Sequence, residues 1–427
     1  MFTSKFARVF ALLIALSIAV VACASPTATP TPAPRPTQPP EPTALPAPTN
    51  TAVIVPPTPS VLSSATKAAG LRAALDRLLS EHVVLASSAT GAALAGRAKD
   101  FEAAAAALDA NSVDISKAIG SVYGDAAEKA FLPLWRKHIG FIVDYTTGLA
   151  AKDKTKSEKA VNDLLAYADD FGAFLNSANP NLPKAAVSDL VKTHIVTLKD
   201  VIDAQAAGDY TKAYTATRKA FAHMDLIANA FAGAIAKQFP DKFDGNADAG
   251  GSKLRSALTL TLSEHSFLVT VATAAAFGAR DADFKAAAES LDGNSIDLSK
   301  AIGSVYGDAA EKAFLPLWRK HIGFVVDYTA GLAIKDKNKS DKAVSDLLAY
   351  ADDFGAFLNS ANPNLPKAAV SDLVKTHIVT LKDVIDAQAA GDYGKAYTAL
   401  RKAYAHMAAI ADPLSDAIAK QFPDKFK

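Results

Sequence analysis

The sequence predicts an all-α protein built from two tandem copies of one helical bundle, placed after an export signal and a proline-rich segment. Alanine is abundant and alternating β-branched runs are rare, a composition that favours helices over strands. Ser116–Phe141 recurs without a change as Ser299–Phe324. Within each copy, three histidines recur at a constant spacing. Together these observations predict duplicated bundles made of helical hairpins.

Residues 1–22 are typical of an export signal. Lys5 and Arg8 supply positive charge ahead of the apolar run 9–21, which is too short for a comfortable membrane span. The run ends in small residues before Cys23, and this junction resembles the lipobox of bacterial lipoproteins. The resemblance implies that Cys23 carries a lipid and becomes the mature N-terminus. The alternative is an ordinary secretory signal with an incidental cysteine near its end.

Residues 23–61 form a segment dominated by proline, threonine and alanine. Proline fixes φ and removes a backbone donor, so this segment cannot build a helix or a sheet. We expect a disordered, extended stalk that rises about 3 Å per residue and reaches on the order of 100 Å. Its simplest role is to hold the helical domains away from the membrane.

The charge and the motifs exclude several classes of function. A formal net charge of +1 gives no electrostatic case for binding nucleic acid. Cys23 is the only cysteine, so the mature domains have neither internal disulfides nor thiol catalysis. No nucleophile elbow, phosphate loop or dinucleotide fingerprint is present. We therefore predict no catalytic residues; a metal-dependent redox enzyme stays open, and would need a free coordination position.

The duplication defines the domain boundaries. We expect a first helical bundle over residues 62–244 and a second over residues 252–427. The stretch 245–251 is rich in glycine and polar residues and is predicted to be a short flexible linker. Each bundle is expected to be compact, because the repeat unit is longer than that of the open helical solenoids it otherwise resembles.

Each copy divides into three helical hairpins, and hence six helices. His82, His138 and His194 are evenly spaced along the chain, each near the middle of the first helix of a hairpin. The predicted helices are followed by residues that end helices, at Tyr123-Gly124, Asn179-Pro180 and Phe239-Pro240.

The eight histidines fall into two sets of four, one set in each copy. The first three of a set lie on apolar stripes; His138, for example, has Phe131, Trp135 and Ile142 at helical spacing. The fourth lies on a strip of small residues that lets another helix approach closely. We predict that the four imidazoles of each copy point inward and converge. The candidate metal ligands are His82, His138, His194, His223, His265, His321, His377 and His406.

The second helix of each hairpin offers a further polar side chain. The step along the chain that leads from His194 to His223 leads from His82 to Asn111. Because we take the connection of the middle hairpin to be longer, we expect Asp169 at the equivalent place there. A methionine also follows each fourth histidine, where it would favour copper or simply fill core space. The additional candidates are Asn111, Asp169, Met224, Asn294, Asp352 and Met407.

This set of ligands suits a transition metal, namely copper, zinc or iron. The sequence lacks the motifs of zincins, ferritin-like proteins and hemerythrins, and covalent haem attachment is excluded, which leaves non-covalent haem as a less favoured cofactor. Glu81 and Glu264, each next to a histidine, are expected to face outward or to orient a neighbouring group. The alternative to metal binding is a set of core histidines that bond to carbonyls or carboxylates.

Several segments resemble an uncharacterised helical domain of bacterial secreted proteins, which in some chains adjoins a copper amine oxidase N-terminal-like domain. The resemblance covers both copies and rests on Leu108–Ser112, Ile119–Gly124, Leu134–Gly140 and Gln238–Phe243. It implies a cell-surface location and permits metal handling. It brings no ligand set, and no oxidase activity is carried over because no quinone-forming tyrosine motif is visible.

The sequence therefore predicts an extracytoplasmic protein that is anchored to the bacterial membrane by lipid at Cys23 and does not bind nucleic acid. Its expected function is the binding of a transition metal by buried histidines of each bundle, for storage, capture or sensing. The alternative is a non-catalytic structural or interaction module displayed on a stalk. No protein partner is indicated.

Overall fold

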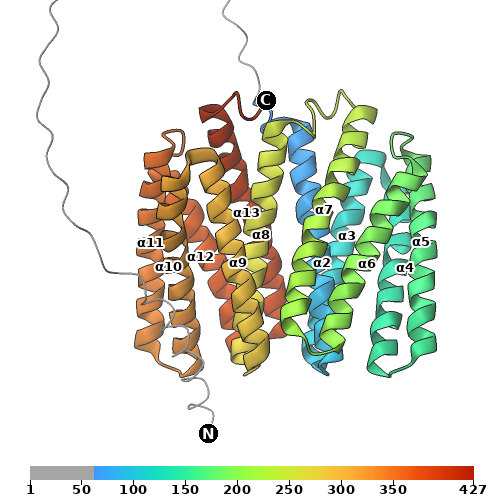
Figure 1. The fold of residues 1–427 in the computed structure, drawn as a ribbon, viewed down its shortest axis with the longest axis horizontal. Helices are drawn as coiled ribbons and strands as arrows, with labels where there is room; N and C mark the ends of the chain where they lie inside the picture. The colour runs from blue at the N-terminus through green and yellow to red at the C-terminus, as the bar shows by residue number, and fades with distance from the viewer. Residues whose placement is uncertain (1–61) are drawn as a thin grey trace, which may run out of the picture. The chain divides into compact units, whose positions relative to one another are not determined.

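The computed structural model describes residues 62–427, and all of the regular secondary structure in that part of the chain is helical (Figure 1). The predicted all-α fold with two duplicated bundles is confirmed. The predicted export signal, the lipidation residue Cys23 and the proline-rich stalk lie outside the described residues.

Each copy contributes six long helices, as the hairpin pattern predicted. The first copy comprises α2 (Lys67–Leu94), α3 (Ala98–Tyr123), α4 (Asp125–Ala150), α5 (Lys154–Ala178), α6 (Lys184–Ala206) and α7 (Tyr210–Gln238). The second comprises α8 (Gly250–Phe277), α9 (Asp281–Tyr306), α10 (Asp308–Ala333), α11 (Lys337–Ala361), α12 (Lys367–Ala389) and α13 (Tyr393–Gln421).

The ends of the helices follow from local sequence. Asp153 and Asp209 are the N-caps of α5 and α7, where their side chains accept bonds from backbone N–H groups that have no partner within the helix. Gly124 separates α3 from α4 with φ of 88°, a conformation that an L side chain rarely adopts. The three predicted helix ends are confirmed, because α3, α5 and α7 end at Tyr123, Ala178 and Gln238.

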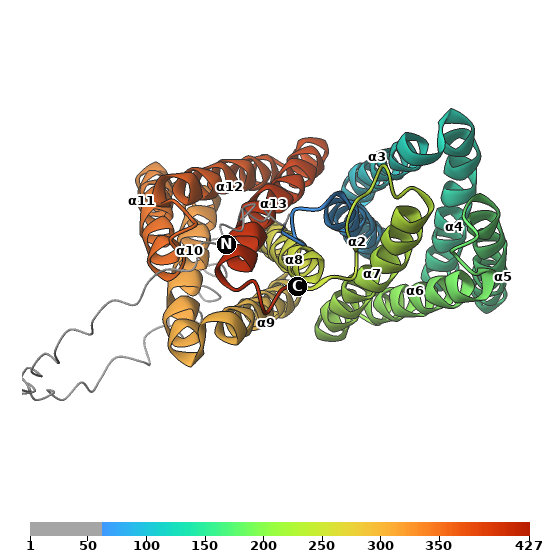
Figure 2. The same cartoon turned by 90° about the horizontal axis from the view of Figure 1, so that it is seen from above.

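Each bundle is a closed ring of helices rather than an open solenoid (Figure 2). α2 packs against both α3 and α7, and α8 packs against both α9 and α13, so the last helix of each copy returns to the first. The first helices of the three hairpins, α2, α4 and α6, also contact one another. These inner helices carry the evenly spaced histidines.

The connection between the copies is packed against the first bundle. Ala247 is buried, and its carbonyl accepts a hydrogen bond from Arg72 of α2. Helix α8 begins at Gly250, so the second bundle starts slightly earlier than the boundary expected at residue 252. The segment 245–251 thus has fixed partners, where the sequence suggested a free spacer.

The two copies pack on each other through α2 and α8, and both belong to one compact unit. α3 of the first copy contacts α13 of the second. The equivalent helices with the copies exchanged, α9 and α7, contact each other in the same way. The interface therefore has the form of a two-fold contact between identical subunits. Val84 of α2 and Phe221 of α7 are part of the apolar core of the second copy.

Reciprocal ion pairs join the copies across this interface. Arg401 of α13 bonds Glu81 and Asp114 in the first copy, and Arg218 bonds the equivalent pair in the second copy, Glu264 and Asp297. The side chain of Glu81 is only 2% exposed. Of the two expectations for Glu81 and Glu264, the outward-facing one is wrong, because each glutamate is held by an arginine of the other copy.

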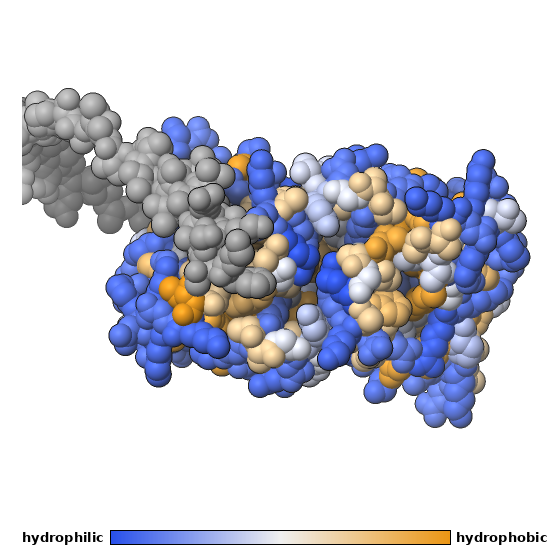
Figure 3. All heavy atoms as spheres, turned by 90° about the horizontal axis from the view of Figure 1, so that it is seen from below, coloured by the Kyte–Doolittle hydropathy of each residue, from blue (hydrophilic) through white to orange (hydrophobic). Residues whose placement is uncertain are grey.

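Helix α8 is the only described helix that is long and apolar enough to cross a membrane. Its apolar window is 72% buried within the protein, which is typical of a core helix. On the face in Figure 3, hydrophilic residues follow the rim of each bundle end and apolar residues gather toward its middle.

Candidate metal centre

Three histidines of each copy meet on the inner helices. His82 of α2, His138 of α4 and His194 of α6 occupy the same place in successive hairpins, so the internal repeat brings them to one level of the bundle. The ring centroid of His82 lies 5.2 Å from that of His138 and 5.8 Å from that of His194. This trio was predicted from the constant spacing and the apolar stripes.

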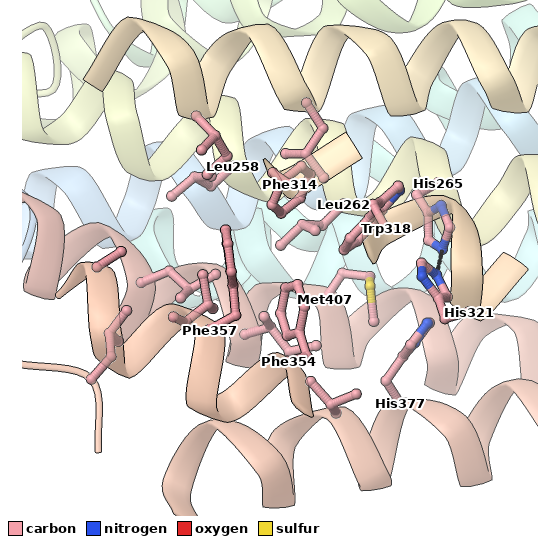
Figure 4. Close-up of a pocket in the computed structure, with 18 of the residues that line it drawn as sticks. Leu258, Leu262, His265, Phe314, Trp318, His321, Phe354, Phe357, His377 and Met407 are labelled. Atoms are coloured by element: carbon pink, nitrogen blue, oxygen red, sulfur yellow. Dashed lines mark hydrogen bonds between the residues drawn. The ribbon is translucent and has the colours of Figure 1, made fainter. Parts of the chain in front are cut away.

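The closest contact in the trio joins two ring nitrogens. Nε2 of His82 lies 3.3 Å from Nε2 of His138, and the same distance separates His265 and His321 in the second copy. His377 completes the second trio, with its ring 5.9 Å from that of His265 (Figure 4). Each copy therefore presents one close histidine pair and a third imidazole beside it.

Aromatic side chains surround the pair. Trp135 lies 5.0 Å from the ring of His82 and 4.7 Å from that of His138, both between centroids. Tyr167 lies 5.3 Å from His138 on the same measure. Among the described residues, no group of three histidine, cysteine, aspartate or glutamate side chains has the arrangement of a complete metal site. The cluster is thus apolar and uncharged, with two nitrogens close together.

Burial keeps these imidazoles neutral. The pKa of His138 is lowered to about 3 and that of His194 to about 4, chiefly by burial and then by one neighbouring imidazole each, because two positive charges would repel. The pKa of His82 also lies well below its ordinary value, chiefly through burial and then through His138 and His194. At neutral pH all three rings therefore carry a lone pair that can bind a metal ion.

The contacts around the close pair limit its tautomers. The carbonyl of Trp135 raises the pKa of His138 against the effect of burial, although Nδ1 of His138 has no partner in normal hydrogen-bond geometry. If the two Nε2 atoms share a hydrogen bond, one of the two neutral rings carries its proton on Nε2 and the other carries its proton on Nδ1. One Nδ1 of the pair then carries a lone pair, and neither Nδ1 has a partner among the described residues.

The fourth histidine has a different role from the one expected. Nε2 of His223 lies 2.9 Å from the carbonyl oxygen of Leu190, and Nε2 of His406 lies 2.9 Å from that of Leu373. This hydrogen bond from an imidazole N–H to a backbone carbonyl joins α7 to α6, and the equivalent bond joins α13 to α12. Nε2 of His223 and of His406 is therefore held by a backbone carbonyl and not by the trio, although His223 and His406 help to lower the pKa of His194 and His377.

Asp169 and Asp352 do not join the histidines. Both carboxylates are exposed and pair with surface lysines, Lys192 and Lys375, at 2.8 Å. The second helices of the hairpins begin at Ala98, Lys154 and Tyr210, which are evenly spaced, so the middle connection is not longer than the others. The residue equivalent to His223 is Tyr167, and a slip of two residues turns a helical side chain to the opposite face.

The predicted amides and thioethers are buried. The Asn111 amide donates to the Leu78 carbonyl and to Glu81, and Asn294 makes the equivalent bonds to Thr261 and Glu264. The amide nitrogens thus position the glutamates, and Oδ1 of each asparagine is buried without a partner among the described residues. Met224 and Met407 are almost fully buried.

In the second copy a small apolar cavity of about 80 Å³ reaches the trio (Figure 4). His265, His321 and His377 line one end of it, together with Trp318 and Met407. The thioether of Met407 is thus buried near the three imidazoles, a position compatible with both roles expected for it. The cross-copy arginines, by contrast, were missed, because their partners lie in the other copy.

No family model matches this chain, and neither the curated proteins nor the solved structures compared with it contain a significant match.

Proposed function

We propose that each bundle binds one transition-metal ion at its histidine trio: His82, His138 and His194 in the first copy, and His265, His321 and His377 in the second. The observation that carries this proposal is the 3.3 Å separation of two Nε2 atoms in both copies. Two nitrogens at about 2.0–2.1 Å from one ion, at a tetrahedral angle, lie about 3.3–3.4 Å apart.

The ligands favour copper in its monovalent state over zinc or iron. All three imidazoles are neutral and buried, and the trio has no carboxylate to offset a divalent charge. Burying an uncompensated double charge costs more than burying a single one. Cu(I) is also the ion that thioethers select, and Met407 lies beside the second trio. Non-covalent haem is not favoured, because a macrocycle would have to separate two nitrogens in a filled core.

We also propose that the ion is held outside the cytoplasm, on a chain anchored by lipid at Cys23, where the protein captures, stores or senses the metal. The export signal and the lipobox-like junction of the sequence support this location. Mass spectrometry of the mature protein from membranes tests it: a diacylated N-terminal Cys23 supports the anchor, and an unmodified thiol contradicts it.

Metal analysis of the full chain tests the ligands. After loading with Cu(I) and removal of excess, we expect two ions per chain. His138→Ala or His321→Ala should leave one, and the double variant none. His223→Gln and His406→Gln are matched controls, since these buried histidines bond to backbone carbonyls, and they should retain two. Absence of bound metal, or full loading of the double variant, would contradict the proposal.

A structural module is the second candidate. The Nε2–Nε2 contact is also within reach of a long hydrogen bond, which would join α2 to α4 without an ion. In that case His138→Ala lowers stability, while metal neither binds nor raises the melting temperature of the natural chain.

A further inference from the structure

The first copy has a cleft that connects the histidine pair with the surface between α2, α3 and α4. It encloses about 240 Å³ and is lined mainly by apolar side chains, including Ala86, Leu108 and Ile142. His82 and His138 lie at its inner end. Its rim carries the ion pair of Arg136 with Asp109, whose atoms are 2.7 Å apart. We call it the α2/α3/α4 cleft.

The size and lining of this cleft define what it can hold. An apolar cavity of about 150 Å³ stays dry and binds benzene, so about 240 Å³ has room for a fused pair of rings. The hydroxyls of Thr90 and Thr146 in the lining already donate to carbonyls of their own helix. Charged ligands would lose hydration without a partner at the inner end. The cleft therefore suits a small, neutral, mostly apolar molecule.

Two polar atoms of the residues at the inner end, Nδ1 of His82 and Nδ1 of His138, have no partner among the described residues. One of these two Nδ1 atoms carries the free lone pair of the neutral histidine pair, and the two residues are 2% and 5% exposed. A buried acceptor without a donor costs free energy that a ligand N–H or O–H would recover. The cleft should therefore bind a ligand that has one such donor more tightly than a ligand that lacks it.

The two copies differ at this place. Val269 of α8 is the residue equivalent to Ala86, and both are buried. The two extra methyl groups of valine occupy space that lies within the cleft in the first copy. The chain's own second copy therefore provides a substitution that narrows the cleft and is compatible with the fold.

We propose that the α2/α3/α4 cleft is a binding site for a small neutral aromatic or heteroaromatic molecule with a single N–H or O–H donor, which bonds to the unprotonated Nδ1 of the His82–His138 pair. This site belongs to the metal-free protein and goes beyond the proposed metal binding. Its occupant reaches the histidine pair from the surface between α2, α3 and α4.

Titration of the metal-free full chain with indole, followed by calorimetry or ligand-observed NMR, tests the site. We expect saturable binding of one indole per chain in this cleft, and binding of 1-methylindole about tenfold weaker because it lacks the donor. Ala86→Val should weaken indole binding at least tenfold. Val269→Ala, the matched change in the second copy, should leave the affinity of the first site unchanged.

A second variant covers the case in which Ala86→Val disturbs the fold. Ala105→Leu fills the cleft from α3, and Ala106→Leu changes the next, exposed residue as its control. Loss of binding in Ala105→Leu alone supports the site. Equal affinity for indole and 1-methylindole, unchanged binding in both filled variants, or no binding at all would overturn it. Because no metal is present, none of these results depends on the copper experiment.

Discussion

The two copies hold the same histidine trio in different surroundings. The close pair is separated by 3.3 Å in both copies, and the residues that line the space beside it are not all the same. The first copy has a cleft toward the surface, where Ala86 replaces the valine of the second. The second copy has an internal cavity, lined by Leu414 where the first copy has the larger Phe231.

This comparison shows that the bundle geometry determines the positions of the histidines, whereas single side chains determine the space beside them. The internal three-fold repeat of hairpins places the histidines, so both copies position them alike. The side chains next to the trio differ between the copies at a few positions, such as Ala86 against Val269, and we expect these positions to set the volume there. The access to each trio can therefore change without any change in its ligands.

The largest expected effect is a loss of folding stability in acid, to which the two trios should contribute equally. The folded-state pKa of His138 is about 3, below its unfolded value of about 6.5, so the unfolded chain binds more protons between these values. Stability is fully present above pH 6.5 and falls by about 1.4 kcal/mol per pH unit per histidine as the pH drops toward 4.

His138→Leu and His321→Leu should each reduce this slope by a similar amount. Urea unfolding at pH 7, 6, 5 and 4.5 measures it. If the slope of the unfolding free energy against pH changes in only one variant, the two trios are not equivalent. If it changes in neither, the histidines do not cause the acid sensitivity.

Arg401 and Arg218, the cross-copy arginines, should differ modestly in how much they contribute to the free energy of unfolding. Removing Arg401 leaves Glu81, whose side chain is 2% exposed, whereas removing Arg218 leaves Glu264, which is 10% exposed. We expect Arg401→Ala to cost about 3 kcal/mol and Arg218→Ala somewhat less, because an unpaired charge costs more where it is better buried. Lys192→Ala, which breaks an exposed pair, should cost under about 1 kcal/mol. Denaturant unfolding at pH 7 decides the order, and a larger loss for Arg218→Ala would contradict it.

Exchanging the cavity residues tests why the second copy has its internal space. Phe231→Leu should destabilise the first copy by about 1–2 kcal/mol, because it leaves a cavity in a packed core. Leu414→Phe should stabilise the second copy or leave it unchanged, since the new ring fills existing space. If Leu414→Phe instead destabilises as strongly as Phe231→Leu, the cavity is not accessible to the ring.

The smallest effect concerns Asp76, at the interface of the copies. Thr259 is the equivalent residue of the second copy. Burial raises the pKa of Asp76 well above its ordinary value, against a lowering by the hydrogen bond from Ser256. The folded chain thus holds this proton more tightly than the unfolded chain, and its stabilising effect is lost as pH rises through the folded pKa.

Asp76→Asn should accordingly raise stability by about 1 kcal/mol at neutral pH, with a smaller gain near pH 4.5. Thermal or urea unfolding of variant and natural chain at both pH values checks the sign. A gain that is larger in acid than at neutral pH would contradict the assignment.

Sequence patterns predicted the helices and the trio because both depend on local periodicity. His82, His138 and His194 share a helical phase with apolar neighbours, so their inward direction follows from spacing alone. Asp169 was misplaced because the alignment of the middle hairpin slipped by two residues, and the equivalent residue is Tyr167. The partners of Glu81 could not be predicted, since Arg401 reaches it only after the two copies pack together.

X-ray absorption at the copper K-edge of the Cu(I)-loaded full chain tests the central claim most directly. We predict two or three imidazole nitrogens per copper at about 2.0 Å, with the same spectrum from His138→Ala and His321→Ala, which each retain one intact trio. A first shell without imidazole scattering, or a copper signal that survives in the double variant, would contradict it.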